Sequence, residues 1–171
     1  MYKFSVRGKD VTVDLEPGVY VFDCVTSSGK TFLCNALKTF KRLGQPVAGY
    51  TYNDMLDGID LDKYVGNEKI ECLVVDRYDM YMNKYIDTIE RLADDGCVVL
   101  VDCKYKALLK LDYELASIEL GAGKVRVYWW FTYSRTGLDS HYRNLYYSVT
   151  QKTDLIMIYS LQVVIETYYQ S

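Results

Sequence analysis

The fold of this chain is decided by the stretch Gly18-Val19-Tyr20-Val21-Phe22-Asp23-Cys24-Val25-Thr26-Ser27-Ser28-Gly29-Lys30-Thr31. An apolar run of β-branched and aromatic residues changes here into small polar residues and then into Gly-Lys-Thr, which predicts a strand, a loop and the start of a helix. Backbone N–H groups in such a loop can point at phosphate oxygens, and the N-terminus of the helix adds the positive end of its dipole. The order of the three elements therefore predicts a phosphate-binding loop.

The last residues of this stretch suit specific roles in phosphate binding. Gly29 permits a close approach of the backbone, Lys30 can reach the β- and γ-phosphates, and the Thr31 hydroxyl can hold Mg²⁺. Two other Gly-Lys pairs, at Gly8 and Gly123, lack the strand and helix context. The predicted nucleotide-binding residues are Val25, Thr26, Ser27, Ser28, Gly29, Lys30, Thr31 and Phe32.

The length and composition predict one domain without a general basic surface. The chain has 171 residues, of which 50% are hydrophobic, and its 20 basic and 23 acidic residues give a net charge of −3. This balance excludes the strongly basic class of general nucleic-acid binders. The start of the chain lacks the apolar region of a signal peptide, and no run approaches the ~18 apolar residues that span a bilayer. We expect a single domain over residues 1–171, in the cytoplasm and away from membranes.

Cysteine and tyrosine usage points to a reduced, aromatic interior. The five cysteines are odd in number, lie mostly in apolar runs and form no Cys-x-x-Cys pair, so the sequence indicates neither a disulfide framework nor a zinc site. They are Cys24, Cys34, Cys72, Cys97 and Cys103. The 18 tyrosines are expected mainly in the core and at its margin.

The first half of the chain alternates predicted strands and helices. Residues 2–6 and 11–15 alternate apolar and polar side chains around Arg7-Gly8-Lys9-Asp10, which predicts a β-hairpin. Residues 19–23 are apolar on both faces, as in a central strand of a parallel sheet. A helix follows from Thr31 to Gly44, and a short strand is predicted at 47–52. Residues 53–67 are expected to be irregular or to form a short helix, where a substrate or partner could bind.

The apolar stripe of the predicted helix after Thr31 is Leu33, Ala36, Leu37, Phe40 and Leu43.

Two later strands are predicted to end in an aspartate. Residues 72–75 lead into Asp76, which can reach a Mg²⁺ shell or, alternatively, cap the next helix. Residues 97–101 lead into Asp102, which can contact the terminal phosphate through water or orient a nucleophile, or can cap a helix starting near Cys103. The carboxyl ends of parallel strands share one sheet edge, so both carboxylates are expected beside the phosphate-binding loop. Asp79 is a further candidate to orient water.

The remaining segments are predicted as follows. After Arg77-Tyr78-Asp79, a helix is expected to about Asp95, closed by Gly96. Residues 105–120 fit both a helical stripe and an alternating strand, and we favour a helix. Residues 124–133 form a strand, and 154–168 form a helix or a strand pair whose exposed face would favour self-association. Arg135 and Arg143 are candidates to stabilise phosphate charge, each with a solvated surface arginine as the alternative.

The expected inward side chains of the helix ending at Asp95 are Met82, Tyr85, Ile86, Ile89, Leu92 and Ala93. Those expected on one face of the strand 124–133 are Val125, Val127, Trp129 and Phe131. The single histidine, His141, receives no catalytic role.

These residues resemble the P-loop NTPase superfamily, whose phosphate loop reads Gly, four residues, Gly-Lys, then Ser or Thr. Cys24 stands where the first glycine is expected, and Asp76 matches the Walker B aspartate. Arg77 stands where many ATPases of this superfamily carry a glutamate that activates water. The first forty residues look like the opening of ABC-type and SMC-like ATPase domains, although no Leu-Ser-Gly-Gly-Gln signature follows. Viral and bacterial thymidine kinases are similar in their Ser-Gly-Lys-Thr loop, but their zinc cysteines have no counterpart here.

The resemblance implies a three-layer P-loop NTPase-like α/β fold with a mainly parallel sheet and an N-terminal β-hairpin. It implies a small ATP-binding protein, an Mg²⁺-dependent ATPase whose nucleotide state controls binding to a protein or nucleic-acid partner. Alternatives are a kinase acting on a nucleoside or small molecule, and a nucleotide-dependent binding module with little turnover. Mg²⁺ is assigned to Thr31 and Asp76. The expected catalytic residues are Lys30, Asp76, Asp79, Asp102 and Arg135.

Overall fold

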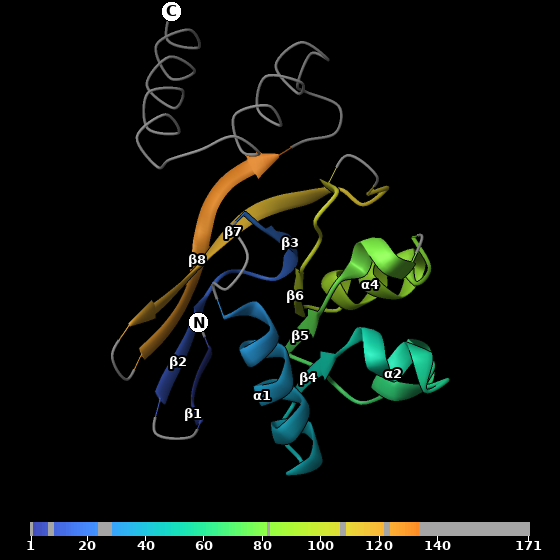
Figure 1. Ribbon diagram of the computed structural model, residues 1–171, viewed down its shortest axis with the longest axis horizontal. Helices are drawn as coiled ribbons and strands as arrows, with labels where there is room; N and C mark the ends of the chain where they lie inside the picture. Colours follow the sequence, from blue (N-terminus) through green and yellow to red (C-terminus); the bar gives the residue numbers. More distant parts are fainter. Residues whose placement is uncertain are drawn as a thin grey trace, which may run out of the picture. The chain divides into compact units, whose positions relative to one another are not determined.

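An eight-stranded, mostly parallel mixed sheet runs through the described part of the chain, as the computed structural model shows (Figure 1). The structure describes residues 2–6, 9–23, 29–81, 83–106, 109–121 and 124–133. The strand order is β1-β2-β8-β7-β3-β6-β5-β4. The strands are β1 (Tyr2–Val6), β2 (Lys9–Asp14), β3 (Gly18–Phe22), β4 (Val47–Tyr50), β5 (Cys72–Val75), β6 (Val98–Val101), β7 (Tyr113–Gly121) and β8 (Lys124–Tyr133). The predicted α/β class with a mainly parallel sheet is confirmed.

Helices fill the connections between the parallel strands. They are α1 (Lys30–Arg42), α2 (Tyr52–Leu56), α3 (Leu61–Val65), the 3₁₀ helix η1 (Tyr78–Tyr81) and α4 (Ile86–Asp94). The segment 53–67, expected to be irregular or a short helix, thus contains α3 and most of α2. Among the described residues, no helix is both long and apolar enough to cross a membrane.

The described residues belong to one compact unit, which ends at Tyr133. The prediction of a single domain over 1–171 also concerns residues 134–171, which lie outside the described residues, so it stays a prediction. Arg135, Arg143, His141 and the segment 154–168, for which the sequence also gives predictions, lie outside the described residues as well.

The N-terminal hairpin pairing is confirmed. β1 and β2 are antiparallel, and β2 continues the sheet by pairing in parallel with β8. The predicted turn extends too far, because its last residues, Lys9 and Asp10, already belong to β2, where they pair with Val6 and Ser5.

The strand that opens the predicted loop lies in the middle of the sheet. β3 pairs in parallel with β6 on one side and with β7 on the other. β5 then pairs in parallel with β6 and with β4. Every residue of β4, β5 and β6 is buried, which is typical of strands covered on both faces. The carboxyl ends of β3, β6 and β5 therefore meet at one edge.

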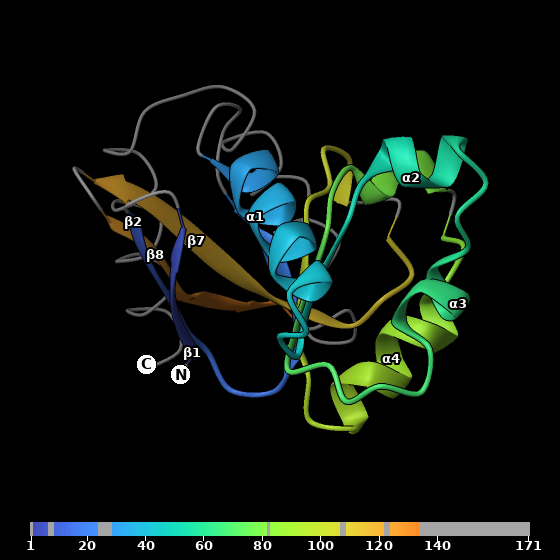
Figure 2. The ribbon, with the colours of Figure 1, turned by 90° about the horizontal axis from the view of Figure 1, so that it is seen from below.

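Helices cover both faces of these central strands. Leu33, Cys34 and Leu37 of α1 share a core cluster with alternate strand residues such as Val74 and Leu100. The intervening residues of the strands are also buried, and α4 contacts β3 and β6. Figure 2 shows α1 and α4 on opposite sides of the central strands. The prediction that Leu43 belongs to the apolar stripe of α1 is wrong, because Leu43 is the C-cap residue of the helix and is 69% exposed.

The predicted helix over residues 105–120 is wrong. Residues 113–121 form β7, held between β3 and the antiparallel neighbour β8. The alternating interpretation fits, since Leu111, Tyr113 and Leu115 are buried while Asp112 and Glu114 between them are not. The spacing of Leu111, Leu115 and Ile118 satisfied a helix equally well, and only pairing with distant strands decides between the two.

The helix predicted to end at Asp95 begins later than expected. Residues 78–81 form η1, and Tyr85 has a φ of 70°, so α4 starts only at Ile86. Met82 lies outside the described residues. The predicted strand 124–133 is confirmed as β8, but Trp129 is 51% exposed, unlike buried Val125 and Val127. The pairing of β7 with β8 shifts register between Leu115 and Ala116, and Trp129 still pairs with Ala116 on the regular side of this shift.

The described cysteines and most described core tyrosines behave as expected. Cys34, Cys72, Cys97 and Cys103 are free and buried, and Cys24 lies outside the described residues. Tyr50, Tyr78, Tyr81 and Tyr85 form an aromatic cluster whose neighbouring ring centroids lie 5.7–6.4 Å apart.

Candidate functional site

The N-terminus of α1 lies at the carboxyl edge of the sheet, where the sequence predicts it. Gly29 precedes the helix with a φ of 95°, a left-handed conformation that glycine adopts without a steric penalty. Lys30 is the first residue of α1, and Phe32 packs partly buried against the core. The residues expected to form the loop itself, Cys24, Val25, Thr26, Ser27 and Ser28, lie outside the described residues.

Thr31 and Asp76, the two residues predicted to hold Mg²⁺, lie in contact. The Thr31 hydroxyl donates a hydrogen bond of 3.3 Å to the Asp76 carboxylate, across 45 positions of the sequence. Asp76 follows β5 directly and is only 7% exposed, whereas Thr31 is exposed at the start of α1. The described hydrogen bond of the Asp76 side chain is thus to the N-terminal turn of α1.

Lys30 pairs with Asp102. The lysine Nζ lies 3.4 Å from the Asp102 carboxylate, and the side chains are 12% and 19% exposed. Residues 103–105 are not helical, so Asp102 does not directly precede a helix in the described part of the chain. The structure therefore brings together four of the predicted site residues: Lys30, Thr31, Asp76 and Asp102.

Register and backbone hydrogen bonds fix the two carboxylates. Val75 pairs with Val101, so Asp76 and Asp102 stand level at the ends of neighbouring strands. The Asp102 amide donates to the Val75 carbonyl at 2.8 Å, and the Asp76 amide donates to the Tyr50 carbonyl at 2.9 Å. The Tyr81 hydroxyl donates to the Asp76 carbonyl at 3.0 Å. The positions of both carboxylates are thus fixed by the ends of paired strands.

The electrostatics at Asp76 favour a cation. Burial raises the pKa of Asp76 above its ordinary value, and the negative charge of Asp102 raises it further. The hydrogen bond from Thr31 and the charges of Arg77 and Lys30 lower it, but they do not outweigh the first two effects. An ionised Asp76 is therefore under-compensated, and a cation beside it would be favourable.

The donor set fits Mg²⁺ bound together with a nucleotide. Mg²⁺ takes oxygen ligands and is commonly held by one or two carboxylates plus substrate phosphates. The Thr31 hydroxyl and the Asp76 carboxylate supply two such oxygens. Among the described residues, no group of three or more His, Cys, Asp or Glu side chains could hold a metal ion on its own. The arrangement thus suits an ion that arrives with phosphate oxygens.

Asp79 and Arg77 follow Asp76 closely in the sequence, but neither has a described hydrogen bond or ion pair to Lys30 or Thr31. The Asp79 carboxylate accepts a hydrogen bond of 3.4 Å from the Lys104 amide, which ties η1 to the segment after β6. Arg77 is exposed and has a φ of 54°, an uncommon conformation for a residue with a side chain. The Tyr78 amide donates to the Asp102 carbonyl at 2.7 Å, so this turn is fixed directly above the strand ends.

Sequence reasoning missed a second buried ion pair at this edge. The Lys106 Nζ lies 3.1 Å from the Asp23 carboxylate, and the side chains are 14% and 6% exposed. Asp23 follows β3 just as Asp76 follows β5 and Asp102 follows β6. The same rule, an acid at the end of an apolar strand, could have identified Asp23, but nothing in the sequence pointed to Lys106.

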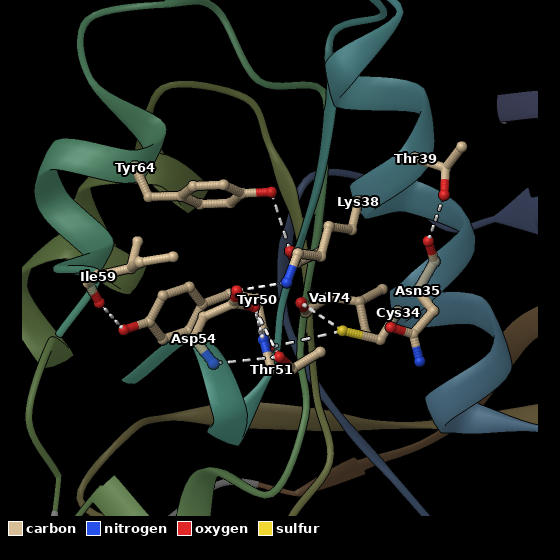
Figure 3. Close-up of polar contacts among 11 residues, drawn as sticks. Cys34, Asn35, Lys38, Thr39, Tyr50, Thr51, Asp54, Ile59, Tyr64 and Val74 are labelled. Carbon is tan, nitrogen blue, oxygen red and sulfur yellow. Dashed lines mark hydrogen bonds and ion pairs between the residues drawn. The ribbon is translucent and has the colours of Figure 1, made fainter. Parts of the chain in front are cut away.

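The far half of α1 is fixed by a separate polar cluster (Figure 3). Lys38 pairs with buried Asp54, which also accepts hydrogen bonds from the Thr51 hydroxyl and amide in a capping box for α2. Burial would raise the pKa of Asp54, but the hydrogen bonds from Lys38 and Thr51 outweigh it, and the pKa lies below its ordinary value. A Cβ on Gly49 would lie 1.9 Å from the Cys34 carbonyl oxygen, so α1 packs directly on β4.

Comparison with known proteins adds no relative. The sequence matches no family model, and it matches neither a curated protein nor a solved structure. The function must therefore be inferred from the residues at the carboxyl edge of the sheet.

Proposed function

We propose that this chain is a P-loop protein that binds ATP with Mg²⁺ and hydrolyses it, and that its nucleotide state controls binding to a macromolecular partner. The observation that carries the proposal is the contact between Thr31 and Asp76, 3.3 Å apart at the N-terminus of α1. Thr31 belongs to the Gly-Lys-Thr sequence and Asp76 ends a buried strand, so both halves of the predicted metal site come from the elements expected of them.

The strand arrangement supports the same proposal. β6 lies between β3 and β5, so Asp102 stands between the strand that leads into the predicted loop and the strand that carries Asp76. α1 covers one face of these strands and α4 the other, which agrees with the proposed three-layer P-loop fold. Ligands of open α/β sheets bind beyond the carboxyl ends of the strands, and this is the edge where the four site residues meet.

Each residue has a distinct part in the proposed reaction. Lys30 neutralises phosphate charge, and the first amides of α1 donate to phosphate oxygens. Thr31 and Asp76 would hold Mg²⁺, which supplies positive charge for the phosphate oxygens when it is bound. Asp102 is the carboxylate positioned to orient the attacking water once Lys30 turns to the phosphates. Asp79 has its carboxylate on the Lys104 amide and is the weaker candidate for this role.

A second candidate function is a binding module with little turnover. Arg77 occupies the position after Asp76, where a water-activating glutamate is expected in many ATPases of the superfamily, and it is exposed. With Asp79 engaged by a backbone amide, Asp102 alone would have to orient the water. These two observations favour slow hydrolysis. No described contact favours the kinase alternative.

Turnover assays separate the candidates. We expect phosphate release from ATP and Mg²⁺ without an added acceptor, and we expect Asp102→Asn to lose release while still binding ATP. ATP binding without release supports the binding module. Transfer only when a nucleoside is added supports a kinase. A chain that binds no ATP contradicts the proposal and both alternatives.

A further inference from the structure

The Asp23–Lys106 pair lies at the start of the predicted phosphate loop. Val21 of β3 pairs with Val101 of β6, so Asp23 stands one residue beyond the level of Asp102 on the neighbouring strand. The backbone of Asp23 is fixed on the other side, where its amide donates to the Ala116 carbonyl of β7 at 2.8 Å. Lys106 comes from the segment after β6, four residues past Asp102.

Charge at this edge is poorly suited to phosphate without Lys106. Asp23, Asp76 and Asp102 end three neighbouring strands, and a polyphosphate near them would be repelled. Lys30 compensates Asp102 at 3.4 Å, and Lys106 compensates Asp23 at 3.1 Å. Lys106 thus offsets the negative charge of Asp23, the residue that directly precedes the predicted loop in the sequence.

Stability alone does not account for this pair. The Asp23 side chain is 6% exposed and the Lys106 side chain 14%, so both charges have lost most of their hydration. The attraction within a buried pair is largely offset by that loss, and apolar residues of the same size often serve a fold as well. The carboxylate does, however, hold the lysine side chain in one conformation. The lysine is therefore already positioned to bind another anion that competes with the carboxylate.

The two lysines reach the carboxyl edge of the sheet from two directions. Phe22 shares the core cluster of α1 with Tyr20, so by alternation Asp23 belongs to the opposite face of the sheet. Lys30 starts α1 on the first face, and Lys106 reaches Asp23 from the segment after β6.

We propose that Lys106 is a second phosphate-binding lysine, which exchanges the Asp23 carboxylate for the polyphosphate of the bound nucleotide. This inference rests on the proposed nucleotide binding. Before binding, Asp23 holds Lys106 and Asp102 holds Lys30. On binding, both lysines turn to phosphate oxygens and remain close enough to the carboxylates at the strand ends to offset their charge.

The test is an equilibrium titration of the full-length chain with ATP and Mg²⁺, repeated with inorganic tripolyphosphate. Lys106→Gln is expected to weaken both affinities by about tenfold, the value of a hydrogen bond to a charged group. Asp23→Asn is expected to strengthen both by about threefold, because it removes the competitor that holds the lysine. Lys104→Gln, which removes an exposed lysine two residues away, serves as the control and should change neither affinity.

Two outcomes overturn the inference separately from the proposed function. Wild-type binding that Lys106→Gln leaves unchanged shows that Lys106 does not contact phosphate, while the proposed function stands. A loss of ATP affinity with no loss of tripolyphosphate affinity also contradicts phosphate contact. If Lys106→Gln does not fold, the double variant Asp23→Asn with Lys106→Gln keeps a neutral hydrogen-bonded pair and must show the same tenfold loss. A wild-type chain that binds no ATP overturns both.

Discussion

The two ends of α1 use the same residue types for opposite purposes. At the N-terminal end, Lys30 and Thr31 meet Asp102 and Asp76 at 3.4 and 3.3 Å, and the pKa of Asp76 is raised because burial and a second carboxylate disfavour its charge. In the second half, Lys38 meets Asp54 in a compact pair completed by the Thr51 capping box. There the pKa of the carboxyl is lowered, since its hydrogen bonds outweigh burial.

The difference indicates where the molecule is built to accept a ligand. The charge of Asp54 is compensated by Lys38 and by hydrogen bonds from Thr51. These contacts hold the second half of α1 against β4 and α2. Asp76 is left under-compensated at the edge where phosphate and Mg²⁺ are expected. Substitutions at the two ends should therefore separate, with losses of stability at one and losses of ligand affinity at the other.

The largest expected effect is on stability, at Asp54. Asp54→Ala leaves the half-buried Lys38 without its carboxylate and removes the Asp54 half of the α2 capping box, so the free energy of unfolding should fall by about 3 kcal/mol in urea denaturation. Asp57→Ala, at an exposed position three residues later, should change it by less than about 0.5 kcal/mol. Equal effects of the two substitutions would contradict the view that Asp54 anchors α1.

The pH dependence of this effect has a defined sign. Because the folded-state pKa of Asp54 lies below its ordinary 3.8, its contribution is complete above that value and is lost as the pH falls through the folded-state pKa. The stability difference between wild type and Asp54→Asn should therefore shrink in strong acid. A difference that grows on acidification would show that the carboxyl is not stabilised as a charge.

The next effect is on affinity, at Thr31. Thr31→Ala removes an oxygen of the proposed metal site, and the affinity for ATP with Mg²⁺ should fall by about tenfold. Thr39→Ala is the matched control, since Thr39 lies exposed on the same helix and its hydroxyl donates to the Asn35 carbonyl. If the Thr39 variant loses as much affinity, the effect of Thr31 is on the helix and not on the ligand.

The smallest effect is a gain of stability at Asp76. Its folded-state pKa lies above 3.8, so its contribution to stability is lost as the pH rises from that value through the folded-state pKa. Asp76→Asn should therefore raise the melting temperature of the ligand-free chain by about 2 °C at about pH 7, and by less at about pH 3. A melting temperature that falls at neutral pH would mean that the protein already compensates this charge.

Much of the site could be predicted from the sequence because its residues are tied to local patterns. Lys30 and Thr31 follow a strand and begin a helix, while Asp76 and Asp102 end apolar runs, and neighbouring parallel strands bring such ends together. The Asp23–Lys106 pair could not be predicted in the same way, because its partners are 83 positions apart and no pattern marks the lysine.

The errors in the fold have a similar cause. The leucine spacing before and within β7 fits a helix, and only pairing with β3 and β8 makes the segment a strand. The left-handed φ of 70° at Tyr85 delays α4, although no glycine or proline marks that position. The register shift opposite Leu115 and Ala116 is likewise a property of the pair of strands and not of either sequence alone.

An equilibrium titration of wild type and Lys30→Ala with ATP and Mg²⁺ tests most directly the claim that the N-terminal end of α1 binds a nucleotide. We expect wild type to bind and Lys30→Ala to lose about a hundredfold in affinity, because the lysine charge meets the phosphates. Lys41→Ala, on the same helix with exposed Glu68 as its partner, should bind as wild type does. Unchanged affinity in Lys30→Ala would show that the N-terminal end of α1 does not bind the phosphates.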